Sequence, residues 1–403
     1  TGPLLPKPMA SLLATLPAWR LIMDDRPDTA ITRHFGDLPD PRIDRTRKHD
    51  LIDILSITLC AFLCGADTWE DVADFGRAKK PWLATFLRLP NGIPSHDTFD
   101  RVFALLDPQA FHDCFVAWVR SLCEDLAGET VHIDGKTLRR SLDRTGLKSA
   151  LHLVSAFAGE ASLSLGQVAV DDKSNEITAI PKLLKILDIR GASITIDAMG
   201  CQKEIARQIV EQEGDYVLAV KDNQPMLLAQ VKRTMDELAD HPRPGATPDS
   251  EGFHETIEKG HGRIETRKVW CAPAVDSADL LGPWKGLTHF GMVERRREVA
   301  GVASTERAYY ITSHATISAQ RLARTIRGHW RIENALHWTL DMSFDEDRSR
   351  VRVGHGAQNL ALIRKIALNL LKNEKTSRRG IQGKRLKAGW DEQYLIKVLK
   401  AGI

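Results

Sequence analysis

The segment RGHWRIENALHW, residues 327–338, is the part of the chain from which we build the fold prediction. No glycine or proline interrupts the sequence between His329 and Asp347, and apolar residues recur at Trp330, Ile332, Leu336, Leu340 and Phe344. This spacing predicts an amphipathic helix with one apolar side. Glu333 and His337 are four residues apart and are expected to share a face, with Asp341 close to it one turn further on. Such a face can hold a hard cation or be an ordinary charged surface.

Two acids further upstream favour the cation site. Asp134 ends the apolar run VHID, residues 131–134, and Asp197 ends the run SITID, residues 193–197. Each run predicts a β-strand, and polar groups gather at strand ends in a mixed sheet flanked by helices. Crowded carboxylates repel one another, and divalent ions relieve that repulsion by binding hard oxygen ligands. The pattern predicts a metal site built from Asp134, Asp197 and Glu333, although many folds end strands in aspartate.

The order of predicted helices and strands along the sequence predicts an α/β protein. Three predicted strands are followed by helix, strand, helix, strand and helix, which is typical of a mixed sheet flanked by helices. We predict a helical N-terminal domain, an α/β core in two pieces, a β-rich insertion and a basic tail. The helical domain covers residues 1–126, and the core covers residues 127–240 and 314–373. The insertion covers residues 241–313, and the tail covers residues 374–403.

The N-terminal region has two open interpretations. Short helices are predicted along it, beginning with an amphipathic one near residues 8–24. A tight turn precedes a helix that Ser95 caps, and this arrangement fits helix-turn-helix docking on DNA through Ser95, His96, Asp97 and Arg101. A plain helical bundle is the favoured interpretation, because such helical turns are common and Asp97 and Asp100 are poor neighbours for phosphates.

Composition limits the partners that the chain can have. Its 403 residues include 56 Lys and Arg against 53 Asp and Glu, a net charge of +3, so binding to a polyanion must come from local patches. The six cysteines form no CxxC pair, which argues for reduced thiols and against structural zinc. The most apolar run, residues 51–65, is too short and too polar to span a bilayer. With no recognisable signal peptide, we expect a soluble protein without a membrane partner.

Several ordered motifs together resemble the DDE transposases of bacterial insertion sequences, and most of all their H-repeat-associated type. The motifs are DGKTLRRS at 134–141, IDAMGCQ at 196–202, VKDNQ at 220–224, HGRIE at 261–265, HWRIEN at 329–334 and EDRSR at 346–350. The resemblance covers nearly the whole chain, including residues 30–125. It implies a ribonuclease H-like core, with a β insertion before the helix that carries the third acid.

The resemblance also implies an activity. It implies Mg²⁺-dependent DNA cleavage at the element ends, with Mn²⁺ able to substitute, followed by attack of the freed 3′-hydroxyl on target DNA. Asp134 would bridge two ions, while Asp197 and Glu333 would each complete one. The implied partner is double-stranded DNA, bound by a homodimer that synapses two ends in the bacterial cytoplasm, at the nucleoid. The alternatives are a transposase-derived protein that binds DNA without cutting it, and a ribonuclease H-like nuclease that acts on RNA–DNA hybrids or junctions.

One departure from the broader group affects the expected DNA contacts. That group surrounds its glutamate with a Tyr–Arg–Glu–Lys signature, but here the Tyr, Arg and Lys positions hold Ile326, His329 and Leu340. The phosphate contacts assigned to that signature therefore cannot be transferred. We consider as substitutes Arg327, His329, Arg331 and His337.

Other residues near the acids are further candidates for DNA binding. Lys136, Arg139 and Arg140 directly follow Asp134 and are expected to hold phosphates. The remaining candidates, each with a turn, cap or solvated-surface alternative, are Lys221, Asn223, His261, Arg263 and the basic tail. Trp330 and Trp338 are expected in the core rather than stacked on a base, and Asp341 is expected to be solvated.

Overall fold

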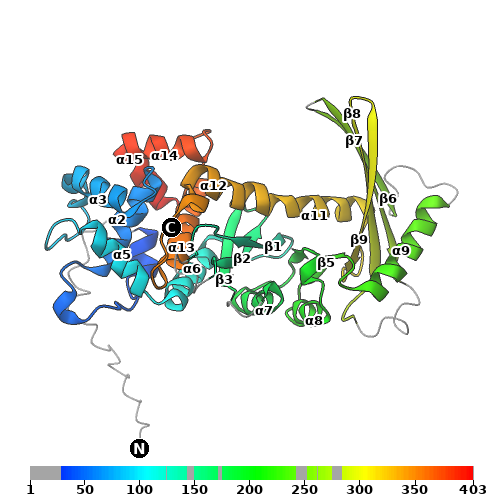
Figure 1. Ribbon diagram of the computed structural model, residues 1–403, viewed down its shortest axis with the longest axis horizontal. Helices are drawn as coiled ribbons and strands as arrows, with labels where there is room; N and C mark the ends of the chain where they lie inside the picture. Colours follow the sequence, from blue (N-terminus) through cyan, green and yellow to red (C-terminus); the bar gives the residue numbers. More distant parts are fainter. Residues whose placement is uncertain are drawn as a thin grey trace, which may run out of the picture.

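The computed structural model describes residues 29–123, 125–142, 149–170, 175–241, 252–260, 262–274 and 284–402. The helix predicted near residues 8–24, and His261, lie outside these ranges. Figure 1 shows an elongated molecule, with helices of the N-terminal region at one end and a β-rich arm at the other. Helix α11 (Ala319–Arg331) runs along the molecule between these two ends.

The centre of the molecule is a mixed sheet, as predicted. The strands β1 (Thr130–Thr137), β2 (His152–Ala158) and β3 (Leu163–Ala169) pair antiparallel, in the order β3-β2-β1. On the other side of β1, β4 (Ser193–Ile196) and β5 (Asp215–Val220) follow in parallel. All four residues of β4 are buried, as expected for a parallel strand that is covered on both faces.

Helices cover both sides of these five strands. Figure 1 shows α7 (Glu176–Ile186) and α8 (Lys203–Glu211) on one side of the strands and α11 on the other. Helix α13 (Gly356–Asn373) is almost wholly buried. It is bound to β3 because the Asn369 side chain bonds both the N–H and the C=O of Ser164, each at 2.9 Å.

The β-rich segment joins this sheet at its edge. Its antiparallel strands are β6 (Phe253–Gly260), β7 (Arg263–Pro273), β8 (His289–Val299) and β9 (Val302–Thr312). Strand β9 pairs with β5, so a single nine-stranded sheet runs from β3 to β6. The far ends of β7 and β8 project beyond the rest of the molecule in Figure 1. Helix α9 (Pro225–Asp240) is bound to β9 through Asp236, which accepts hydrogen bonds from Arg307 and Tyr309.

The N-terminal helices pack into one body with α13. They are α1 (Ala30–Phe35), α2 (Leu51–Leu63), α3 (Trp69–Ala78), α4 (Lys80–Leu83), α5 (His96–Leu105) and α6 (Pro108–Leu122). Thr68 caps α3 in a capping box, as its position before an apolar-periodic run predicts. On α13, the Asn359 amide donates to the carbonyl oxygens of Phe103 and Leu106, both at 2.9 Å. No helix among the described residues is long and apolar enough to cross a membrane.

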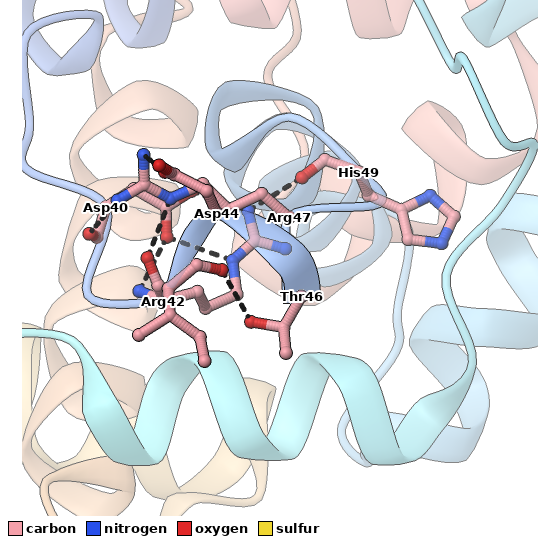
Figure 2. Close-up of polar contacts among 7 residues, drawn as sticks. Asp40, Arg42, Asp44, Thr46, Arg47 and His49 are labelled. Carbon is pink, nitrogen blue, oxygen red and sulfur yellow. Dashed lines mark hydrogen bonds and ion pairs between the residues drawn. The ribbon is translucent and has the colours of Figure 1, made fainter.

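The connector between α1 and α2 is held by a compact polar network (Figure 2). Arg42 donates from two nitrogens to the Asp40 carboxylate, at 2.9 and 2.7 Å, and from Nη2 to the carbonyl oxygen of His49 at 2.7 Å. Arg47 in turn donates from Nε to the carbonyl oxygen of Arg42 at 2.7 Å. These bonds satisfy backbone carbonyls that no helix or strand uses. They fix the direction in which the chain enters α2.

The C-terminal segment is more internal than its composition suggests. It forms α14 (Ile381–Trp390) and α15 (Glu392–Lys400), and Figure 1 places both at the helical end of the molecule. Lys384 is buried and donates to the carbonyl oxygen of Leu371 at 2.7 Å, while buried Arg385 donates to that of Phe62 at 2.8 Å. For these two residues the expected contact with DNA is wrong, because their charges are used inside the protein.

Candidate active site at the ends of β1 and β4

Asp134 and Asp197 lie on neighbouring strands. The expectation that Asp134 ends its strand is wrong, because β1 continues along β2 to Thr137. Asp134 is instead the first residue beyond the parallel pairing of β1 with β4. Ile133 of β1 pairs with Ile196 of β4, so Asp134 and Asp197 come next on neighbouring parallel strands. Adjacent strands lie about 4.8 Å apart, which brings the two residues close. Asp197 also caps a short 3₁₀ helix, Ala198–Gly200, and accepts from the N–H groups of Met199 at 3.0 Å and Gly200 at 3.3 Å. Its carboxylate is therefore held at the edge of the sheet.

Glu333 lies in a π-helical turn that the sequence pattern did not predict. Between α11 and α12 (Trp338–Phe344), the turn η4 (Ile332–His337) is π-helical, and the N–H of Trp338 bonds the carbonyl oxygen of Glu333. The expectation of an uninterrupted α-helix is wrong here, although Ile332 and Leu336 within the turn are both buried, as the spacing predicts. Such turns are frequent at functional sites. Partial burial, and then the negative charge of Asp134, raise the pKa of Glu333, so the two carboxylates interact.

His337 faces Asp134 rather than solvent. Its Nε2 lies 3.4 Å from Asp134 Oδ2, and its side chain is only 12% exposed. Burial raises the pKa of Asp134, but the contact with His337 and the charges of His337 and His329 outweigh burial and lower the pKa overall. This position fits an imidazole that orients the carboxylate, and it leaves little surface for the DNA contact expected of His337.

His329 is also turned inward. Its Nδ1 lies 2.9 Å from the hydroxyl oxygen of Thr195 on β4, and the same hydroxyl lies 2.7 Å from Nδ1 of His132 on β1. Burial lowers the pKa of His329 and lowers that of His132 to about 3, so both rings favour the neutral form. The bonds tie α11 to the two strands that carry the acids. Single-sequence patterns do not reveal this structural role of His329, and the contact with DNA expected of it stays a prediction.

Lys136 is bound by protein carboxylates. Its Nζ lies 2.9 Å from Glu346 and in closer contact with Asp341, and the Lys136 and Glu346 side chains are 12% and 1% exposed. Asp341 is therefore held in an ion pair rather than solvated as predicted, and the phosphate contact of Lys136 stays a prediction. The physical reason for the ion pairs is that a buried glutamate needs a cation, and Lys136 is the cation that reaches it.

A cleft opens beside these residues between β1 and the π-helical turn. It encloses about 570 Å³ and is lined by Gly135, Lys136, Thr137, Arg139, Glu333, Asn334, His337, Trp338, Asp341 and Asp347. Trp338 is 61% exposed, as Trp330 is at 58%, so their predicted place in the core is wrong. The buried stripe of this helix consists of Ile332, Leu336, Leu340 and Phe344 instead.

The other predicted DNA contacts are scattered around this site. Arg139 is 82% exposed at the cleft, 3.6 Å from Asp347, and Arg140 and Lys221 are exposed. Arg327 forms a bidentate ion pair with Glu258 of β6, with one bond of 2.9 Å. The remaining three contact protein groups: Arg331 with Glu160 at 3.6 Å, Arg263 with Glu265 at 3.7 Å, and the Asn223 amide with the carbonyl oxygen of Ala198 at 2.7 Å. Asn223 thereby supports the loop that follows Asp197.

The donor chemistry suits a hard cation, although no compact metal group is formed. Within the described ranges, no three His, Cys, Asp or Glu side chains are gathered closely enough to hold a metal ion. Asp134, Asp197 and Glu333 nevertheless offer only carboxylate oxygens, the ligand type that Mg²⁺ prefers. Asp134 and Asp197 each follow the last residue of the β1–β4 pairing, and Glu333 interacts electrostatically with Asp134. On donor type, these residues fit a divalent cation.

Comparisons with known proteins agree with one another. The chain matches the family described as "Transposase DDE domain" over residues 127–370, and the family described as "DDE_Tnp_1-associated" over residues 32–119. It is 40% identical, over 92% of this chain and 97% of the other, to the "H repeat-associated putative transposase YhhI" of Escherichia coli K12. An "uncharacterized protein in dhlA 3′region" of Xanthobacter autotrophicus is 50% identical over 70% of this chain and 93% of its own length.

A solved structure is also similar at low identity. The piggyBac transposase, solved as a synaptic complex with hairpin DNA, matches with a TM-score of 0.37 and 11% identity. The match covers 92% of this chain and 77% of that one.

Proposed function

The chain belongs to the family of DDE transposases, and from this premise we propose that it cuts DNA at the ends of an insertion sequence and joins the freed 3′-hydroxyl to target DNA. The observation that carries the proposal is the placement of Asp134 and Asp197 directly after the last paired residues of β1 and β4. Glu333 adds a carboxylate from the π-helical turn, and it lines the cleft together with Gly135, the residue after Asp134.

The family resemblance gives the core its proposed fold type. We propose that β1 to β5 form a ribonuclease H-like core, a mixed sheet with two antiparallel and two parallel pairings flanked by helices. Two features support this proposal. Asp134 and Asp197 lie just beyond the paired residues of β1 and β4, and the strands β6 to β9 are inserted before the helix that carries Glu333.

In this proposal Mg²⁺, or Mn²⁺ in its place, is held by Asp134, Asp197 and Glu333. When bound, such ions generate a hydroxide nucleophile and stabilise the attacking and leaving oxygens of an in-line displacement. The protein's own groups keep the ligands in place: His337 contacts Asp134, and two backbone N–H groups hold the Asp197 carboxylate. Thr195 and His329 fix the helix that leads to Glu333.

Double-stranded DNA is the proposed partner, and a homodimer synapsing two ends in the bacterial cytoplasm, at the nucleoid, is the proposed assembly. Arg139 and Arg140 are exposed beside Asp134 and are the side chains that we assign to phosphate contact. Asn334 and Trp338 also face the cleft, where they can contact a nucleotide.

Arg139→Gln is expected to weaken binding to an end duplex at every sequence position alike. It should lower the slope of log Kd against log salt by about 1, the value for one phosphate contact. Fluorescence anisotropy between about 50 and 200 mM salt measures this slope. Arg190→Gln is the matched control, because Arg190 is 68% exposed beside Asp188, outside the cleft. An unchanged slope in Arg139→Gln would remove Arg139 from the interface.

Strand joining tests the proposed reaction. A duplex taken from the DNA that flanks the gene, already cut to end in a 3′-hydroxyl, is incubated with the protein, Mg²⁺ and a supercoiled plasmid. We expect joined product with the 3′-hydroxyl duplex and none with an otherwise identical 3′-deoxy duplex. Tight binding of the duplex without joining would favour the alternative, a transposase-derived protein that binds DNA only.

A further inference from the structure

A fourth carboxylate lies against β1 next to Asp134, on the side of the sheet opposite Glu333. It belongs to Glu176, the first residue of α7. A Cβ atom placed on Gly135 would lie 2.1 Å from Oε1 of Glu176 and 2.6 Å from Nε2 of His152. Successive residues of a strand face opposite sides, so Gly135 turns toward α7 where Asp134 turns toward α11. Only glycine at position 135 lets Glu176 rest on the backbone of β1 beside Asp134.

His152 fixes the orientation of this carboxylate. Its Nε2 lies 2.7 Å from Glu176 Oε1, and its Nδ1 lies 2.8 Å from the Thr137 hydroxyl. An ionised carboxylate only accepts hydrogen bonds, so Nε2 donates to it, and in the neutral ring Nδ1 then accepts from Thr137. The imidazole is thereby held at both nitrogens. Oε1 of Glu176 makes this contact with His152, whereas Oε2 takes no part in it.

Glu176 also lies within electrostatic reach of both Asp134 and Asp197. Burial raises its pKa, and the negative charges of Asp197 and Asp134 raise it further against the lowering effect of His152. A carboxylate kept half-buried beside two others is costly unless it has a positive partner. His152 is one such partner, and a cation at the strand ends would be a second.

We propose that Glu176 is a fourth acidic ligand of the active site, approaching the divalent cation from the α7 side while Glu333 approaches from the α11 side. The proposal rests on the function proposed above. It makes His152 and Gly135 positioning residues: His152 orients the carboxylate, and Gly135 leaves room for it. Mg²⁺ is held by carboxylate oxygens, and Glu176 would supply one from the side of the sheet opposite Glu333.

The test is Mn²⁺ binding to the full chain without DNA, measured from the electron paramagnetic resonance signal of free Mn²⁺. Glu176→Gln keeps the size of the side chain and an oxygen that can accept from His152, but it removes the charge. We expect the Kd for Mn²⁺ to rise by at least about tenfold, the lower end for loss of a metal-supporting group. Glu211→Gln, at an exposed carboxylate on α8, should leave the Kd unchanged.

Asp134→Asn, titrated in the same way, separates the two claims. If Asp134→Asn weakens Mn²⁺ binding and Glu176→Gln does not, the role of Glu176 is refuted while the proposed metal site stands. If neither variant changes the Kd, the metal site itself is refuted.

Folding is checked in EDTA by thermal unfolding. His152→Gln supplies a second variant that leaves Glu176 in place. Loss of orientation alone should raise the Kd by less than Glu176→Gln does. An unchanged Kd in this variant would overturn the positioning role of His152.

Discussion

Asp134→Asn is expected to reduce Mg²⁺-dependent DNA cleavage by at least about a thousandfold, because a metal centre contributes several kcal/mol to such a reaction. Asp134 interacts with each of the other groups. It neighbours Asp197, contacts His337, and its negative charge raises the pKa of Glu333. Asparagine keeps the shape but supplies no negative charge to a cation. Binding of the end duplex should persist, since the exposed arginines beside the cleft are unchanged.

The matched control for this variant is Asp222→Asn. Asp222 follows β5, the next strand along the sheet, but it is exposed and does not line the cleft. Its replacement should leave the cleavage rate unaltered. Single-turnover cleavage of a labelled end duplex gives both rates. A normal rate in Asp134→Asn would remove Asp134 from the site.

Lys136→Met is expected to lower the free energy of unfolding by about 3–5 kcal/mol, the usual cost of removing one partner from a buried ion pair. The Glu346 side chain is 1% exposed, and Lys136 is its only partner in an ion pair among the described residues. Burial raises the pKa of Glu346, but the charges of Lys136, Lys365 and Arg364 outweigh burial and lower it. Without Lys136 the glutamate would be buried with its nearest cation missing. Urea unfolding monitored by circular dichroism measures the loss.

Two further measurements separate the ion pair from general damage. Lys136→Met combined with Glu346→Gln should recover part of the lost stability, because the buried charge is then removed as well. A carboxyl group with a lowered folded-state pKa stabilises above its unfolded pKa, and this contribution is lost as the pH falls through the folded value. The difference between parent and Lys136→Met should therefore shrink as the pH is lowered below the ordinary range of glutamate. If Lys136→Met lowers the free energy of unfolding by less than about 1 kcal/mol at neutral pH, the Lys136–Glu346 ion pair does not stabilise the fold as proposed.

The three acids could be predicted because the signals for them are local. Asp134 and Asp197 end short apolar runs, and parallel strands bring their ends to one edge of a sheet. Glu333 belongs to a long stretch with helical spacing and no glycine or proline after position 328. Alternation of apolar and polar residues likewise predicted the strands β6 to β9. This alternation does not indicate which strand the segment joins, and the pairing of β9 with β5 is seen only in the structure.

The remaining features depend on contacts between distant parts of the chain. Lys136 follows Asp134 in sequence, but its partner Glu346 is 210 residues away, and no local pattern distinguishes a buried ion pair from a phosphate contact. Glu176 and Gly135 likewise meet only when α7 packs on β1. Trp330 and Trp338 each stand two residues from a member of the buried stripe, Ile332 or Leu336, and on a helix of 3.6 residues per turn this puts them on the opposite side. Their large apolar side chains favoured the core, but their spacing did not.

The most direct test of the account is cleavage of a labelled duplex, taken from the flanks of the gene, by the protein and by its Glu333→Gln variant. Both proteins are assayed with Mg²⁺ and with EDTA. We predict that the parent cuts only with Mg²⁺, and that the variant binds the duplex but does not cut it. Equal cutting by both proteins would contradict the role of Glu333. Tight binding with no cutting by either would contradict the proposed transposase activity.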